Sequence, residues 1–269
     1  MSTATGSQRM TRRSAGRKAL RRYLPPQHGA WAMLLVPYAV GVVLAGPAWP
    51  HLPLLVGWLA GYLLSYYALL AVKTRRPGRV RDQLRLYSAL AAPALLVVVV
   101  ARPVLLWAGP VFAVLLAVSA WYAWRRDERS IVNDLAGITQ GTLMIPVAAL
   151  AGGLPATATW PVWAVTWLYF AGTAFYVKTM IRERGQRSWW LVSVGYHVAA
   201  AAVTVAVAAT VAGAPAAVTT GVLFGWLAVR AAVLPRFALS PKQVGILEIV
   251  HSVVLLVVLT VAPGLTAGR

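Results

Sequence analysis

The chain has 269 residues, of which 59% are hydrophobic and only 12% are charged, and its mean hydropathy is +0.69. Soluble domains carry roughly 45–50% apolar and about 25% charged residues, so this composition excludes an ordinary soluble domain and predicts an integral membrane protein. The absence of cysteine excludes disulfides and thiolate metal sites. The formal net charge of +19 would suggest nucleic acid as the partner of a soluble protein, but no nucleic-acid-binding motif accompanies it. Membrane lipids are therefore the expected partners, nucleic acid is not expected, and the oligomeric state stays open.

The amino-terminal stretch 1–24 is basic and polar. No apolar run followed by a small-residue cleavage site precedes the first long span, so a removable signal is not expected. We expect a disordered cytoplasmic tail over 1–24, followed by a transmembrane domain over 25–269.

Nine apolar segments approach the roughly 20 residues that a helix needs to cross the hydrocarbon. They cover residues 30–46, 52–72, 87–101, 104–123, 135–152, 161–177, 189–212, 217–234 and 244–262. The third is the shortest, and Pro37, Pro93, Pro110 and Pro146 lie inside spans, where membrane helices tolerate proline by kinking. The predicted fold class is an all-α polytopic membrane protein.

The basic residues predict how the chain crosses the membrane. If the tail is cytoplasmic, nine spans place every Lys and Arg on the cytoplasmic side except Arg102 and Arg269. Because cytoplasmic loops are enriched in Lys and Arg, this distribution supports nine spans, with the amino terminus inside and the carboxyl terminus outside. The expected location is the inner (plasma) membrane.

A short motif occurs twice, as Val72-Lys73-Thr74 after the second span and Val177-Lys178-Thr179 after the sixth. Each copy opens a basic loop, which suggests parallel four-helix repeats over about 25–125 and 126–234, plus a final helix at 244–262. Cations at the mouth of a helix bundle suit phosphate or anionic lipid headgroups, although the bias for positive cytoplasmic loops would also place them there. The candidate ligand-binding residues are Gln27, Lys73, Arg76, Arg79, Tyr176, Lys178, Arg182 and Arg184.

Four residues are candidates for polar or proton-transfer groups. Glu248 lies inside the last span with His251 on the same helix face, and it is either functional or a helix-start carboxylate near the interface. Asn133 and Asp134 open the fifth helix, where Asp134 also suits an ordinary cap. His28, unlike the prolines and Trp31 around it, has no structural explanation. The candidate catalytic residues are therefore His28, Asn133, Asp134 and Glu248, while Gln140, deeper in the fifth span, needs a partner from another helix.

The segment Pro26-Gln27-His28-Gly29-Ala30-Trp31-Ala32-Met33, continuing to Pro37, resembles the YwiC-like family of bacterial membrane proteins. This resemblance extends over most of the chain and implies a multi-pass membrane protein. The resemblance gives no information about a biochemical activity.

The architecture is also similar to the UbiA prenyltransferase superfamily, as is the segment Asn133-Asp134-Leu135-Ala136-Gly137. That resemblance implies polar loops after helices two and six that cap a cytoplasmic cavity, with aspartates that hold Mg²⁺ and a prenyl diphosphate. Here the first loop offers only Asp82 and the second only Glu183. No cofactor is therefore predicted, and Mg²⁺ is expected only if Asp82, Asp134 or Glu183 contribute.

The functional prediction is a cytoplasm-facing cavity that holds an anionic-headed isoprenoid or quinone-type lipid. If the chain is an enzyme, the UbiA resemblance implies a divergent prenyltransferase in which Lys73, Arg76, Lys178 and Arg182 neutralise the anion directly. Two alternatives stay open, a transporter or exporter of a small anion and a non-catalytic membrane assembly protein.

Overall fold

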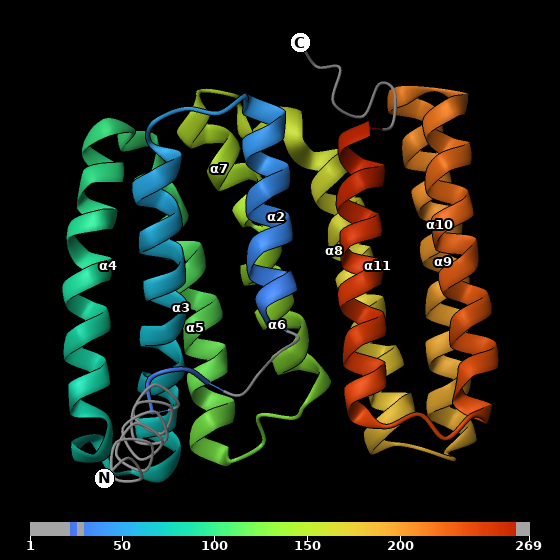
Figure 1. Ribbon diagram of the computed structural model, residues 1–269, viewed down its shortest axis with the longest axis horizontal. Coiled ribbons are helices and arrows are strands. Elements are labelled where there is room, and N and C mark those ends of the chain that lie inside the picture. Colours follow the sequence, from blue (N-terminus) through green and yellow to red (C-terminus); the bar gives the residue numbers. More distant parts are fainter. Residues whose placement is uncertain (1–21, 26–29, 262–269) are drawn as a thin grey trace, which may run out of the picture.

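The computed structural model describes residues 22–25 and 30–261, and the described residues form helices and no strands (Figure 1). The helices are α2 (Ala30–Ala45), α3 (His51–Thr74), α4 (Arg81–Ala101), α5 (Ala108–Arg125), α6 (Ile131–Thr142), α7 (Met144–Gly152), α8 (Trp160–Val177), α9 (Arg187–Ala212), α10 (Ala214–Val233) and α11 (Pro241–Val261). The predicted tail over 1–24 lies outside the described residues, apart from 22–24.

Seven segments of the described chain are long and apolar enough to cross a membrane. They are His51–Thr74, Pro77–Ala101, Pro103–Arg125, Ile131–Gly152, Arg187–Ala212, Ala214–Arg236 and Pro241–Val261. Two predicted spans are not among them, α2 with 16 residues and α8 with 18. The all-α polytopic membrane fold is confirmed.

The third span is longer than predicted, because α4 begins at Arg81 and runs for 21 residues. Its first turns carry the polar residues that the apolar pattern excludes, so hydropathy alone placed the start too late. The shortest of the predicted spans is instead α2.

The fifth predicted span is divided into α6 and α7 at Leu143. Proline has no backbone N–H, so Pro146 cannot donate to the carbonyl of Thr142, four residues earlier. The break falls at that missing hydrogen bond, as expected for a proline inside a membrane helix.

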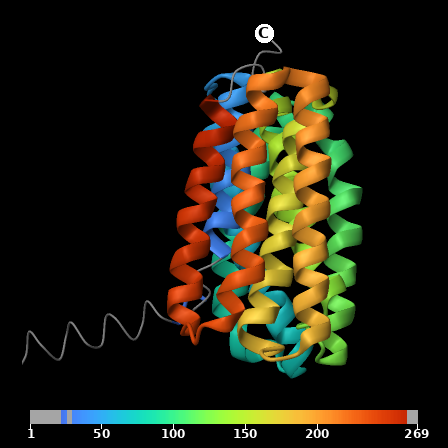
Figure 2. The ribbon, with the colours of Figure 1, turned by 90° about the vertical axis from the view of Figure 1, so that its right-hand side faces the viewer.

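Successive helices run in opposite directions, except α6 and α7, which continue in the same direction, and four loops lie at the lower edge of Figure 1. These loops, 75–80, 126–130, 178–186 and 234–240, form what we call the basic end of the bundle. Figure 2 shows the same helices from the side as nearly parallel rods. Both Lys-Thr motifs lie at the basic end, as the repeat hypothesis requires, whereas the repeats themselves and the orientation in a membrane stay predictions.

Helix α2 packs closely against α7 through small residues. A Cβ atom added at Gly41 of α2 would lie 2.5 Å from the carbonyl oxygen of Ile145 and 2.8 Å from Cβ of Ala148. Without a hydrophobic drive between helices in lipid, such close backbone approach supplies the contacts that hold membrane helices together. The indole of Trp58 in α3 donates to the carbonyl of Leu34 at 3.0 Å and ties α3 to α2.

Candidate functional site

A cavity of about 420 Å³ opens near the basic end between α2, α6, α8 and α11. We call it the basic-end cavity. Its polar lining residues are Asp134, Thr173, Lys178, Arg182, Glu248 and Ser252, and its apolar walls include Met33, Ile138, Phe170, Ala174, Val244 and Ile249. The structure thus gathers four predicted site residues, Asp134, Lys178, Arg182 and Glu248, from three separate parts of the chain.

Lys178 begins a π-helical turn, Lys178–Arg182, which continues directly from α8. Because a charged side chain is costly to bury alone, Lys178 has several partners. Its ammonium donates to the carbonyl of Arg129 at 2.6 Å and lies 3.8 Å from a carboxylate oxygen of Asp134. It also lies 5.4 Å from the ring centroid of Trp189. The lysine therefore holds the α5–α6 loop against the end of α8.

Glu248 forms a buried ion pair with Arg230, and the two residues are 6% and 2% exposed. The hydroxyl of Thr173 donates to the second carboxylate oxygen at 2.9 Å. The guanidinium of Arg230 lies 3.9 Å from the ring centroid of Tyr176, a cation–π contact. Tyr176 thus contacts Arg230 and is absent from the lining of the cavity.

Arg230 was counted from the sequence only as one of the basic residues on the cytoplasmic side, near the end of the predicted span 217–234. In the structure it lies inside α10 with its side chain buried. Its sequence context, a single cation with apolar residues on both sides, was the signal for an intramembrane ion pair with Glu248. Thr173 and Ser252 carried no such signal and were missed.

The other predicted residues of the basic end lie outside the cavity. Arg76 and Arg79 are exposed, and Arg184 donates to the carbonyl of Phe237 at 3.0 Å. Asn133 donates to the carbonyl of Glu128 at 2.8 Å, and Asp134 is not the helix cap, because Ser130 occupies that position. Gln27 and His28 lie outside the described residues.

The two motif lysines contact the same loop from different helices. Lys73, at the end of α3, forms an ion pair with Glu128 at 2.8 Å, whereas Lys178 contacts Arg129 and Asp134. Residues 128–134 are thus held by both copies of the motif. Lys73 lines neither this cavity nor the second one described below.

The Lys73–Glu128 pair gives a pH-dependent prediction. Burial raises the pKa of Glu128, but the ammonium of Lys73, the Glu128 backbone and the charge of Arg129 together hold that pKa below its ordinary value of 4.5. A lowered folded-state pKa stabilises the protein above the unfolded value, and this stabilisation is lost as the pH falls through the folded pKa. The stability difference between wild type and Lys73→Met should therefore be present near neutral pH, begin to shrink near pH 4.5 and disappear as the pH falls through the lower folded-state pKa.

Thermal unfolding of both proteins across that pH range measures this difference. Arg76→Met is the matched control, because it removes an exposed cation with no ion pair to a described residue. A Lys73→Met difference that persists unchanged in acid would show that the pair does not stabilise the fold.

The two loop carboxylates named for Mg²⁺ are apart from the cavity. Asp82 lies 3.5 Å from Arg22, and Glu183 accepts from Gln186 at 2.7 Å. In the described part of the chain, no three His, Asp or Glu side chains gather closely enough to hold a metal ion.

Comparison with known proteins identifies one matching family model and two similar proteins. Residues 24–149 match the model of the family described as YwiC-like protein. "Uncharacterized protein YwiC" of Bacillus subtilis is 34% identical over 184 residues, which cover 66% of this chain and 75% of that protein. An "Uncharacterized protein" of Haemophilus influenzae is 33% identical over 247 residues, 88% of this chain and 96% of its own length. No solved structure matches.

Proposed function

The chain belongs to the YwiC-like protein family, and we propose that it binds an amphipathic lipid with an anionic head in the basic-end cavity. The names of the matched relatives state no activity, so the proposal rests on the charges and walls of the cavity itself. The ligand expected is an isoprenoid phosphate or a lipid of the same chemistry. The proposal concerns binding and includes no bond-forming step.

The charge balance of the cavity carries the proposal. Both lining carboxylates have their own cation, Asp134 with Lys178 and Glu248 with Arg230. Arg182 is the additional cation: its charge also acts on Asp134, but it lines the cavity without an ion pair or hydrogen bond to another described residue. A guanidinium presents several donors in a planar fork and favours phosphate over other heads.

The remaining walls suit the hydrocarbon part of such a ligand. Ile138, Phe170, Ala174 and Ile249 face the cavity, and its volume of about 420 Å³ is in the range of roughly 300–1,000 Å³ usual for small-molecule sites. Beyond Ser252, the buried residues Leu255 and Leu259 of α11 close the packing toward the opposite end. This closed end favours binding over transport of a small anion.

The test compares two ligands that share one chain, farnesyl phosphate and farnesol, on the full protein in nanodiscs. Arg182→Gln is expected to weaken farnesyl phosphate binding by about tenfold or more, the value of one charged hydrogen bond, and to leave farnesol binding unchanged. Arg184→Gln is the matched control, because Arg184 belongs to the same loop and lies outside the cavity.

A second variant tests the space in the cavity separately from the charge of Arg182. Gly245 lines the cavity, and a Cβ atom added there meets nothing within 4 Å, so Gly245→Leu should fill the space without disturbing the backbone. It is expected to weaken binding of both ligands. If farnesyl phosphate binds equally to wild type, Arg182→Gln and Gly245→Leu, the proposal is wrong.

A further inference from the structure

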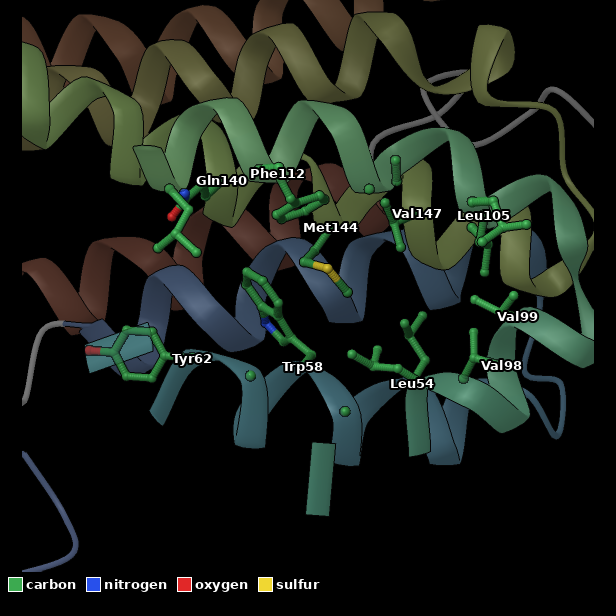
Figure 3. A pocket seen from close by; sticks show the side chains of 18 of the residues that line it. Leu54, Trp58, Tyr62, Val98, Val99, Leu105, Phe112, Gln140, Met144 and Val147 are labelled. Carbon is green, nitrogen blue, oxygen red and sulfur yellow. The ribbon is translucent and has the colours of Figure 1, made fainter. Parts of the chain in front are cut away.

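A second cavity, of about 440 Å³, lies between α3, α4, α5 and the α6–α7 segment, and we call it the lateral cavity (Figure 3). The α6–α7 segment separates it from the basic-end cavity. Asp134 and Ile138 line the basic-end cavity, whereas Gln140, Met144 and Val147 line the lateral one. We propose that the lateral cavity binds a single-chain neutral lipid, with the hydroxyl or carbonyl of its head at Gln140.

The walls exclude a charged head. None of the described residues that line the cavity is charged, and most are aliphatic or aromatic, including Leu54, Val98 and Leu105. Trp58 and Phe112 line it as an edge-to-face pair with ring centroids 6.0 Å apart. Since an ion moved into such a site has no partner and loses its hydration, a neutral ligand is required.

The polar groups gather at one end. Gln140 and Tyr62 lie toward one end of the cavity in Figure 3, while Leu105, Val98 and Val99 lie toward the other. Gln140 makes no hydrogen bond with any residue that the structure describes, although its amide has both donors and an acceptor. In a membrane interior such an amide is costly without a partner, and the head of a neutral lipid would supply one.

The space exists partly because two lining residues are glycines. A Cβ atom added at Gly61 of α3 or Gly109 of α5 would meet nothing within 4 Å. The cavity also reaches the outer surface of the bundle, because Leu106 lines it and is 61% exposed. A lipid chain can therefore enter from the bilayer without opening the bundle.

The experiment uses 1-decanoylglycerol with a diazirine in its chain, photolysed with the full protein in phosphatidylcholine nanodiscs. Saturable labelling is expected on cavity residues of α3, α4 and α5, and excess unlabelled 1-decanoylglycerol should remove it. Gly61→Leu and Gly109→Leu should each lower this labelling by about tenfold, because each displaces several buried methylene groups of the ligand. Gln140→Leu should lower it by a smaller factor.

Two controls make the result specific. Gly195→Leu adds the same side chain at an exposed position of α9 with open space around it, and labelling should not change. Gly245→Leu should also leave it unchanged while weakening farnesyl phosphate binding, so failure of this site and failure of the basic-end proposal are distinguishable. Labelling that does not saturate, or that both Gly61→Leu and Gly109→Leu leave intact, would come from ordinary contact between the protein and the bilayer. Either result would overturn the proposal.

Discussion

Replacing Glu248 with leucine is expected to destabilise the protein by about 3–5 kcal/mol, the usual cost of breaking a buried ion pair by removing one partner. Arg230 is 2% exposed, so Glu248→Leu leaves its buried guanidinium without a carboxylate, beside the ring of Tyr176 and the Nδ1 atom of His251 at 3.4 Å. The hydroxyl of Thr173 loses its shorter hydrogen bond, at 2.9 Å to Glu248, and keeps only the carbonyl of Tyr169 at 3.3 Å as an acceptor. The free energy of unfolding in mixed SDS micelles measures the effect.

Removing the other partner of the ion pair, by Arg230→Met, should destabilise the protein by less than Glu248→Leu does. The carboxyl of Glu248 can bind a proton and keep its hydrogen bond with Thr173, whereas a guanidinium has no neutral form to adopt. The double variant Arg230→Met/Glu248→Leu should recover to within about 1 kcal/mol of wild type, because it removes both charges and keeps the volume. Equal stability of Glu248→Leu and wild type would mean that the ion pair contributes nothing to the fold.

Gly41→Ala is expected to destabilise the protein by roughly 1–3 kcal/mol, the cost typical of overpacking a close contact. The new Cβ would lie 2.5 Å from the carbonyl oxygen of Ile145, and a backbone atom cannot rotate away as a side chain can. Helices α2 and α7 must then separate, which weakens a contact at the centre of the bundle. Thermal unfolding of the purified protein tests the expectation.

The matched control is Gly225→Ala in α10, where the same added atom meets nothing within 4 Å. Both substitutions change helix propensity in the same way, so the difference between them isolates the close approach of α2 and α7. If the two variants unfold at the same temperature, the helices are not held by the small residue at Gly41.

Much of the fold follows from local chemistry. Long apolar runs interrupted by basic loops can only form membrane helices, since each must satisfy its own backbone hydrogen bonds in lipid. The division of the fifth span follows from Pro146 in the same way. What hydropathy misplaced was the start of α4 at Arg81, because polar residues continue a helix beyond the hydrocarbon.

The candidate site depends less on local chemistry. The sequence pointed to Glu248 as an unusual group inside a span, and in the structure Glu248 is buried and lines a cavity. It did not identify Arg230 as its partner, because a cation near the end of a span satisfies the charge rule as well as a buried pair does. Gln140 was expected to find a partner on another helix and has none among the described residues.

The two Lys-Thr motifs show which properties the sequence determines by itself and which the tertiary structure decides. Composition and spacing determined that this is an all-α membrane protein with both motifs at one end of the bundle. Tertiary structure alone decided that Lys178 is buried beside a cavity while Lys73 stays largely exposed in an ion pair with Glu128. Identical residues acquire different surroundings because burial and charge compensation depend on which helices pack together, and that packing brings in residues far away in the chain.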